Sequence, residues 1–171
     1  AARVLAAGAD KISINSPALE RPALINELAD AFGVQCVVIG VDSLRDADGQ
    51  WRVRQYSGDP SMTQALGKLT MDWLQEAQAL GAGEVVLNCM GSDGARDGYD
   101  IGQLQAARAI CQVPLVASGG AGTREHFSRV FRDADVDAAL AASIFHSGVL
   151  SIPTLKSYLR DENIEVRDVC D

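Results

Sequence analysis

The sequence GAGEVVLNCM, residues 81–90, decides the fold class. Its apolar run, residues 84–90, carries valine and leucine on both faces, which is typical of a parallel-sheet strand covered on both sides. The glycines at 81–83 end a helical pattern and lead directly into the strand. Related junctions precede two other apolar runs, as GAD at 8–10 and ADVDAAL at 134–140. This recurring helix–turn–strand junction favours a repeated βα unit, as in a (β/α)8 barrel.

Five apolar runs along the chain are predicted strands, and amphipathic helical patterns separate them. The expected strands cover residues 11–15, 36–42, 84–90, 114–119 and 138–145, and the expected helices cover 1–7, 17–32, 69–80, 101–111, 125–131 and 152–160. Residues 43–68 depart from this alternation, because 46–49 predict a turn and 51–56 an exposed strand. We therefore expect an α/β chain with right-handed crossovers and a β-hairpin inserted after the second strand.

The strand count sets the expected domain organisation. A complete barrel takes about 250 residues, whereas these 171 residues supply five predicted strands and begin without a methionine. We expect residues 1–171 to form a single partial barrel domain that lacks the N-terminal strands. Such a piece has two open sheet edges, so self-association is also expected.

Composition excludes several classes of partner. With 15 Lys and Arg against 23 Asp and Glu, the net charge of −8 argues against nucleic acid or an anionic membrane as the main partner. No apolar run approaches the roughly 20 residues of a membrane helix, and no signal peptide is recognisable. The four cysteines form no CxxC pair and there are two histidines in different segments, so neither a zinc-finger site nor a histidine-rich metal site is expected. Buried, reduced thiols in a cytoplasmic protein are expected instead.

Polar residues follow the predicted strands, and function in parallel sheets gathers at the carboxyl ends of the strands. Asp42 ends the second strand and is a candidate general acid or base, with a turn cap as the alternative. The segment SGGAG, residues 118–122, is a candidate phosphate cradle, because glycines let backbone N–H groups approach an anion. A plain tight turn is the alternative. Ser143, after the next strand, would share the same anion.

Other strand ends leave two interpretations open. Asn15 and Ser16 follow the first strand, where Ser16 is expected to cap a helix or to help bind a second anion. Two anion sites on one face would suit an elongated substrate with a phosphate at each end. Ser57 and Gly58 predict either a lid over the site or an ordinary turn. In SDGARDG, residues 92–98, turn and solvent-exposed roles are expected for Asp93 and Arg96.

Six segments carry a resemblance to a known family. They are ADKISINSPAL (9–19), VVIGVD (37–42), QYSGD (55–59), GAGEVVLNCMGSDGARDGYD (81–100), PLVASGGAGTREHF (114–127) and DAALAASIFH (137–146). Together and in this order they resemble the cyclase subunit of imidazole glycerol phosphate synthase. The resemblance covers nearly all of the chain and corresponds to the carboxyl-terminal two-thirds of that subunit.

The resemblance implies a (β/α)8 barrel that acts in histidine biosynthesis. The family's cyclase combines ammonia with PRFAR, an aminoimidazole ribonucleotide that carries two phosphates, and releases imidazole glycerol phosphate and AICAR. A glutaminase subunit supplies the ammonia through the barrel axis. No cofactor is implied.

The resemblance also implies roles for individual residues. Asp42 corresponds to an acid/base aspartate, whose partner carboxylate lies on the family's first strand, outside this sequence. The implied substrate- and phosphate-binding residues are Asn15, Ser16, Ser57, Gly58, Asn88, Asp93, Gly94, Ser118, Gly119, Gly120, Ala142 and Ser143. Lys11 and Glu84 correspond to half of an ammonia gate, although the residues alone predict a structural ion pair. Asp10 and Gln35 correspond to the face on which the glutaminase docks.

Two alternatives remain open at this point. One is the related two-phosphate barrel isomerase of the same pathway. The other is a non-catalytic partial barrel that binds phosphate or self-associates.

Overall fold

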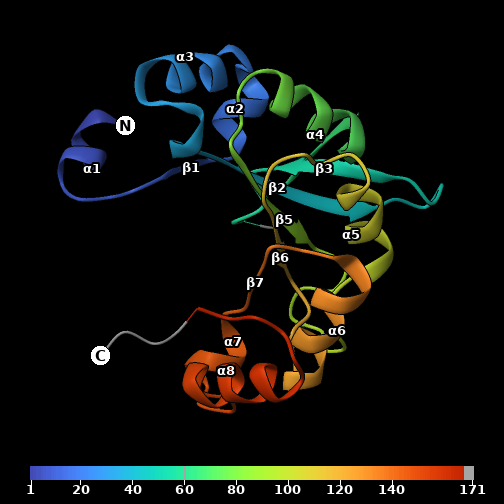
Figure 1. Ribbon diagram of the computed structural model, residues 1–171. Coiled ribbons are helices and arrows are strands. Elements are labelled where there is room, and N and C mark those ends of the chain that lie inside the picture. The colour runs from blue at the N-terminus through green and yellow to red at the C-terminus, as the bar shows by residue number, and fades with distance from the viewer. Residues whose placement is uncertain (60, 168–171) are drawn as a thin grey trace.

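The computed structural model describes residues 1–59 and 61–167, arranged as Figure 1 shows. Within these residues one seven-stranded sheet has the order β4-β3-β2-β5-β6-β7, with β1 paired to β2. The strands are β1 (Ile12–Ile14), β2 (Val37–Arg45), β3 (Trp51–Gln55), β4 (Gln64–Leu69), β5 (Glu84–Cys89), β6 (Leu115–Ser118) and β7 (Ala138–Leu140). All pairings among β1, β2, β5, β6 and β7 are parallel. The predicted α/β fold is confirmed.

Strand β2 joins the two parts of the sheet. Its first residues pair with β1 on one side, and Val38 to Ser43 pair with β5 on the other. From Asp42 to Arg45 it pairs antiparallel with β3, so β2 continues three residues past its predicted end. Pairing with the hairpin explains the extra length. Cys36, predicted to start this strand, lies in the short 3-10 helix η1 (Val34–Cys36).

The larger helices lie along the outer side of the curved sheet (Figure 1). The helices are α1 (Ala2–Ala6), α2 (Ser16–Glu20), α3 (Ala23–Phe32), α4 (Thr70–Ala79), α5 (Ile101–Arg108), α6 (Arg124–Ala134), α7 (Ser143–His146) and α8 (Ile152–Asp161). Fully buried side chains of the sheet, such as Ile39, Leu87 and Leu115, belong to the same core as Trp73 of α4 and Phe127 of α6. This apolar layer holds the carboxyl ends of the strands in a fixed order.

Three local predictions are wrong, for identifiable reasons. The helix expected over 17–32 is divided into α2 and α3, because Pro22 has no N–H to continue the first helix. The strand expected over 138–145 ends at Leu140, and Ser143 begins the short helix α7. Ser16 is not a side-chain cap, since its hydroxyl accepts a hydrogen bond from the Tyr56 N–H instead.

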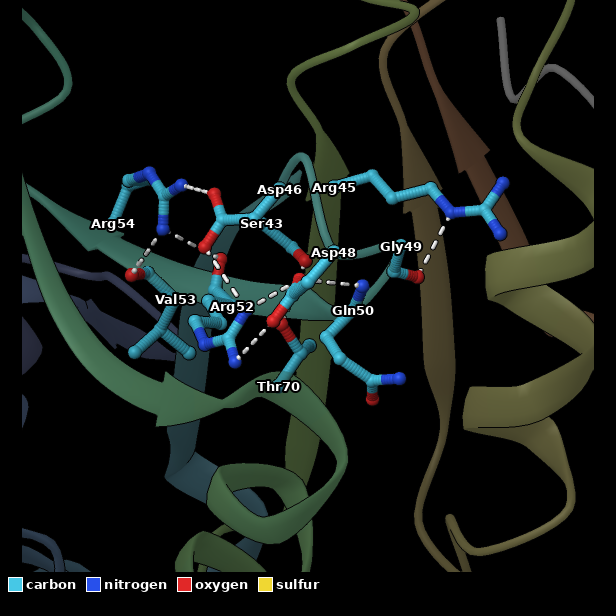
Figure 2. Close-up of polar contacts among 10 residues, drawn as sticks. All are labelled: Ser43, Arg45, Asp46, Asp48, Gly49, Gln50, Arg52, Val53, Arg54 and Thr70. Carbon is cyan, nitrogen blue, oxygen red and sulfur yellow. Dashed lines mark hydrogen bonds and ion pairs between the residues drawn. The ribbon is translucent and has the colours of Figure 1, made fainter.

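The inserted segment is an antiparallel hairpin of β3 and β4, packed against the end of β2. Its first turn is held by the ion pairs drawn in Figure 2. The Asp46 carboxylate pairs with the guanidinium groups of both Arg52 and Arg54, and Asp48 lies 2.8 Å from Arg52. The hairpin and its turn agree with prediction, but β3 is not the exposed strand expected, because Val53, Arg54 and Gln55 are buried. Strand β4 was not predicted, because apolar and polar residues alternate too weakly over Gln64–Leu69 to indicate a strand.

The two outermost parallel strands differ from the central ones. Within the described part of the chain, β1 pairs only with β2, and β7 pairs only with β6. Neither contains a fully buried residue, whereas six of the nine residues of β2 are buried. Across residues 1–59 and 61–167, no helix combines the length and the apolar character that a membrane span requires.

Candidate functional site

The carboxylate of Asp42 is the centre of a side-chain cluster at the carboxyl end of β2. The residue is only 8% exposed. Its Oδ2 accepts hydrogen bonds from Asn15 Nδ2 at 2.6 Å and from the hydroxyl of Ser57. Its Oδ1 accepts one from Asn88 Nδ2 at 2.7 Å. Three donors therefore fix both oxygens of one carboxylate, which is the arrangement of a charged group held in a defined position.

Sheet register and the hairpin bring these donors together. Asn88 lies directly opposite Asp42 in the parallel pairing of β2 with β5, and Asn15 follows β1 on the other side. Ser57 follows β3, which is tied to α2 by several contacts. Gln55 Nε2 donates to the carbonyl of Ser16 and to Glu20 of α2, at 3.2 and 3.1 Å. The contacts between the hairpin and α2 therefore place the Ser57 hydroxyl against Asp42. Ser57 is half-buried there.

The cluster has the composition of a proton-transfer site. A carboxylate can give and accept protons when a substrate group reaches it, and the surrounding amide and hydroxyl donors keep it oriented. Asn15 Oδ1 is buried and accepts no hydrogen bond within the described residues. This leaves one further acceptor beside the carboxylate for a donor on a ligand.

A cavity of about 230 Å³ opens at the carboxyl ends of the neighbouring strands β5, β6 and β7. Eight of the predicted binding residues line it, namely Asn88, Asp93, Gly94, Ser118, Gly119, Gly120, Ala142 and Ser143. Asn88 is shared with the Asp42 cluster, so one side chain belongs to both parts of the site. The structure thus brings together the glycine segment and the start of α7, as the sequence predicts.

The glycines of residues 118–122 serve a packing role that the sequence did not reveal. A Cβ on Gly120 would lie 2.1 Å from the carbonyl oxygen of Gly98, and one on Gly122 would lie 2.0 Å from that of Arg96. Gly120 also has φ +108°, a conformation that favours glycine. These glycines therefore let the loop after β6 lie against the loop after β5.

His126 completes this loop. Its Nδ1 accepts hydrogen bonds from the N–H groups of Gly122 and Thr123, at 3.0 and 3.3 Å. An imidazole that accepts at Nδ1 is neutral and carries its proton on Nε2. Two of the N–H groups expected to face an anion are thus already bonded to this histidine, which leaves the earlier N–H groups of the loop for a ligand.

Arg96 is a cavity residue that sequence reasoning missed. Its side chain is exposed, as expected, and it also lines the cavity, which was not expected. Its φ of +60° turns the chain within the glycine-rich loop, and its carbonyl packs on Gly122. The only sequence signal is a cation inside a loop of turn residues, two residues after Gly94. Arg124, at the start of α6, pairs with Glu125 at 2.9 Å and lies over the Tyr158 ring.

Other predicted residues lie apart from this site. Lys11 and Glu84 form an ion pair where β1 and β5 begin, at the opposite end of the strands. Asp10 and Gln35 are exposed near the same end. Gly58 is exposed, and no atom beyond its chain neighbours lies within 4 Å of its Cβ position.

Within residues 1–59 and 61–167, the cysteines and the remaining titratable groups add no second site. Cys36, Cys89 and Cys111 are free thiols, Cys36 only half-buried, and Cys170 lies outside the described residues. Burial raises the pKa of the Cys89 thiol, and it raises that of Cys111 to about 11. Among the residues that the structure describes, no three His, Cys, Asp or Glu side chains gather as metal ligands would.

Known proteins resemble this chain along almost its whole length. The model of the family described as "Histidine biosynthesis protein" matches residues 1–151. The imidazole glycerol phosphate synthase subunit HisF of Stenotrophomonas maltophilia (strain R551-3) is 70% identical over 169 residues, 99% of this chain and 66% of that protein. The protein of the same name from Xylella fastidiosa (strain M12) is 72% identical over 166 residues, 97% of this chain and 65% of that protein. The chain thus spans just under two thirds of the length of these relatives, and it belongs to the histidine biosynthesis protein family.

Proposed function

We propose that this protein is the cyclase subunit of an imidazole glycerol phosphate synthase, which converts PRFAR and ammonia to imidazole glycerol phosphate and AICAR. The observation that carries the proposal is the triply hydrogen-bonded Asp42 carboxylate beside a glycine-lined cavity. The names of the relatives, which cover nearly the whole chain, support it.

Asp42 acts as the general acid or base of the reaction. Its carboxylate moves protons at the substrate's hydroxyl and amine groups while ammonia adds to the carbonyl. Asn15, Asn88 and Ser57 keep the carboxylate oriented, and Asn88 also lines the cavity beside the glycine segment. A second carboxylate, in the part of the relatives beyond this chain, completes the acid–base pair.

Two anion sites hold the substrate by its ends. The cavity beside the glycine segment takes one phosphate, through backbone N–H groups and through Ser118 and Ser143. Arg96 adds a positive charge at the same cavity. Asn15 and Ser16 form part of the other site. Ser57, with Gly58 after it, closes the space between the two sites.

The opposite end of the strands receives ammonia. The Lys11–Glu84 ion pair gates its entry, and Asp10 and Gln35 belong to the surface on which a glutaminase subunit docks. The reaction needs no metal or organic cofactor, and the protein acts in the cytoplasm.

The five parallel strands are part of a (β/α)8 barrel, within one partial barrel domain over residues 1–171. The helices on the outer side of a curved parallel sheet support this (Figure 1). The singly paired strands β1 and β7 are the edges at which three further strands join. Without those strands the open edges promote self-association. Light scattering on the 171-residue chain, with its intact mass verified, tests this point, and a monodisperse monomer would contradict it.

The full-length gene product, incubated with PRFAR and an ammonium salt, tests the activity. We expect formation of imidazole glycerol phosphate and AICAR, and a loss of at least about a hundredfold in kcat for Asp42→Asn. Asp72→Asn, the same change at an exposed aspartate of α4, is the matched control and should retain activity. A folded wild-type protein without turnover contradicts the cyclase proposal. Turnover retained by Asp42→Asn contradicts only the role of Asp42.

A further inference from the structure

Three polar side chains are buried behind the candidate site, on the side of β2 away from Asp42. Ser43 and Thr70 are 0% exposed, and Gln103 is 1% exposed. The hydroxyl oxygens of Ser43 and Thr70 lie 2.7 Å apart, and Gln103 Nε2 donates to the Ser43 hydroxyl. Thr70 begins α4, Gln103 lies in the first turn of α5, and Ser43 follows Asp42 on β2 (Figure 2 draws Ser43 and Thr70).

This group is unusual for its location. It belongs to the layer between the sheet and its helices, where fully buried apolar side chains such as Trp73 and Leu104 flank Thr70 and Gln103 on the same helices. Burying three polar groups there costs free energy that their hydrogen bonds offset, and replacing all partners by apolar residues of similar shape can be nearly neutral or stabilising. Bulk stability therefore does not explain why the layer is polar at this point.

The position of Ser43 suggests what the group does. Successive side chains of a strand point to opposite faces, so fixing Ser43 on one face also fixes the direction in which Asp42 projects on the other. The carbonyl of Ser43 additionally accepts a hydrogen bond from the Met90 N–H at 2.9 Å. Ser43 is thus held by α4, by α5 and by the end of β5. Asp42 in turn must meet donors that come from three separate elements.

We propose that Ser43, Thr70 and Gln103 form an outer clamp that positions the Asp42 carboxylate for proton transfer. The clamp acts through the backbone of β2, so its members are positioning residues that do not touch the substrate. The inference rests on the proposed function for its catalytic consequence, and on the Asp42 hydrogen bonds for its structural consequence. The structural consequence, a change in the hydrogen bonds to Asp42, can be measured without any turnover.

A pair of conservative changes at Thr70 separates hydrogen bonding from packing. Thr70→Val keeps the shape and removes the hydroxyl, whereas Thr70→Ser keeps the hydroxyl and removes a methyl group. In the full-length protein we expect Thr70→Val to lower kcat about tenfold while KM for PRFAR changes less than about twofold, because a slightly misplaced catalytic group slows chemistry more than binding. Thr70→Ser should retain most of the wild-type kcat.

The triple variant Ser43→Ala/Thr70→Val/Gln103→Leu removes the whole clamp without leaving an unpaired polar partner. We expect it to fold and to lose at least as much kcat as Thr70→Val. Ile25→Val, a buried change in α3 that costs about 0.5–1.5 kcal/mol, is the control for a general loss of stability and should keep the wild-type kcat. If the triple variant does not fold, the comparison of Thr70→Val with Thr70→Ser alone tests whether the clamp positions Asp42.

The measurement that does not need activity is NMR of the side-chain amides of Asn15 and Asn88. Both donate to Asp42, so their amide protons should move upfield in Thr70→Val as those hydrogen bonds lengthen, and should stay in place in Thr70→Ser and Ile25→Val. Unchanged amide resonances together with an unchanged kcat in Thr70→Val would overturn the clamp. If the wild-type protein has no cyclase activity, the proposed function fails, and the amide resonances alone judge the clamp.

Discussion

The Asp42 cluster and the glycine-lined cavity lie side by side at the same edge of the sheet, yet they are built in different ways. The cluster consists of side chains that strand register brings together, with Asn88 opposite Asp42. The cavity is shaped by backbone, where Gly120 and Gly122 pack on carbonyl oxygens of the preceding loop. Side-chain changes should therefore weaken the cluster locally, whereas one added methyl group in the glycine segment should displace a whole loop.

Gly120→Ala tests the second half of this comparison and has the largest expected effect. The new Cβ would lie 2.1 Å from the Gly98 carbonyl oxygen, at φ +108°. Backbone strain and overpacking together should lower the free energy of unfolding by roughly 3–5 kcal/mol. Denaturant unfolding measures this loss.

Gly148→Ala is the matched control for Gly120→Ala. Gly148 has φ +68° and no atom within 4 Å of its Cβ position, so only the conformational cost of about 1 kcal/mol remains. Equal losses in the two variants would mean that the contact between the loops contributes nothing.

Removing the hydrogen bond between Asn88 and Asp42 tests the first half of the comparison. A hydrogen bond to a charged group contributes roughly 1.5–3 kcal/mol. In a double-mutant cycle, Asp42→Ala and Asn88→Ala should therefore couple by about 1.5 kcal/mol, measured by denaturant unfolding.

Ser118→Ala provides the control pair for this cycle. Ser118 lies opposite Asn88 in β6, two strands away from Asp42. Ser118→Ala and Asp42→Ala should be additive within about 0.5 kcal/mol. Coupling of similar size in both cycles would show that the cluster and the cavity are one network rather than two.

The same contrast explains what the sequence could predict. Asp42, Asn88 and Ser118 are polar residues at the ends of apolar strands, and strand ends meet at one edge, so their proximity follows from pattern alone. The contact of Gly120 with Gly98 and the use of His126 Nδ1 as an acceptor depend on the paths of two loops. No periodicity encodes a loop path.

The errors in the fold have a similar origin. Ser16 has the residue type of a helix cap, but the hairpin arrives from 40 residues away and its Tyr56 N–H takes the hydroxyl. The end of the last strand was misplaced because ALAASIF is equally apolar in a strand and in a short helix. In both cases the local sequence is compatible with two structures, and a long-range contact or tertiary packing determines which one forms.

The Lys11–Glu84 ion pair should matter much less to stability than either region. Its side chains are 48% and 18% exposed, and surface pairs contribute about 0–1 kcal/mol. Lys11→Met should therefore lower the free energy of unfolding by no more than about 1 kcal/mol, with a difference that shrinks in high salt. A loss as large as that of Gly120→Ala would mean that the pair stabilises the sheet itself.

The smallest effects concern two exposed carboxylates, one beside each region. A hydrogen bond from Arg52 lowers the pKa of Asp48, in the hairpin turn, to about 2, and one from Arg124 lowers that of Glu125, after the glycine segment, to about 2. Because both pKa values are depressed in the folded state, each contact stabilises the fold above the ordinary pKa of the acid. That contribution is lost as the pH falls through about 2.

Titration of the two carboxyl groups by NMR then tests whether the regions are independent. Arg52→Gln should raise the pKa of Asp48 toward its ordinary value of 3.8 and leave Glu125 unchanged, whereas Arg124→Gln should raise that of Glu125 toward 4.5 and leave Asp48 unchanged. The two arginines lie on separate elements, β3 and α6, and each pairs with a carboxylate of its own segment, so neither change should affect the other carboxylate. If either variant moved both titrations, the hairpin and the glycine segment would have to shift together, and the separation of a side-chain cluster from a backbone cavity would not hold.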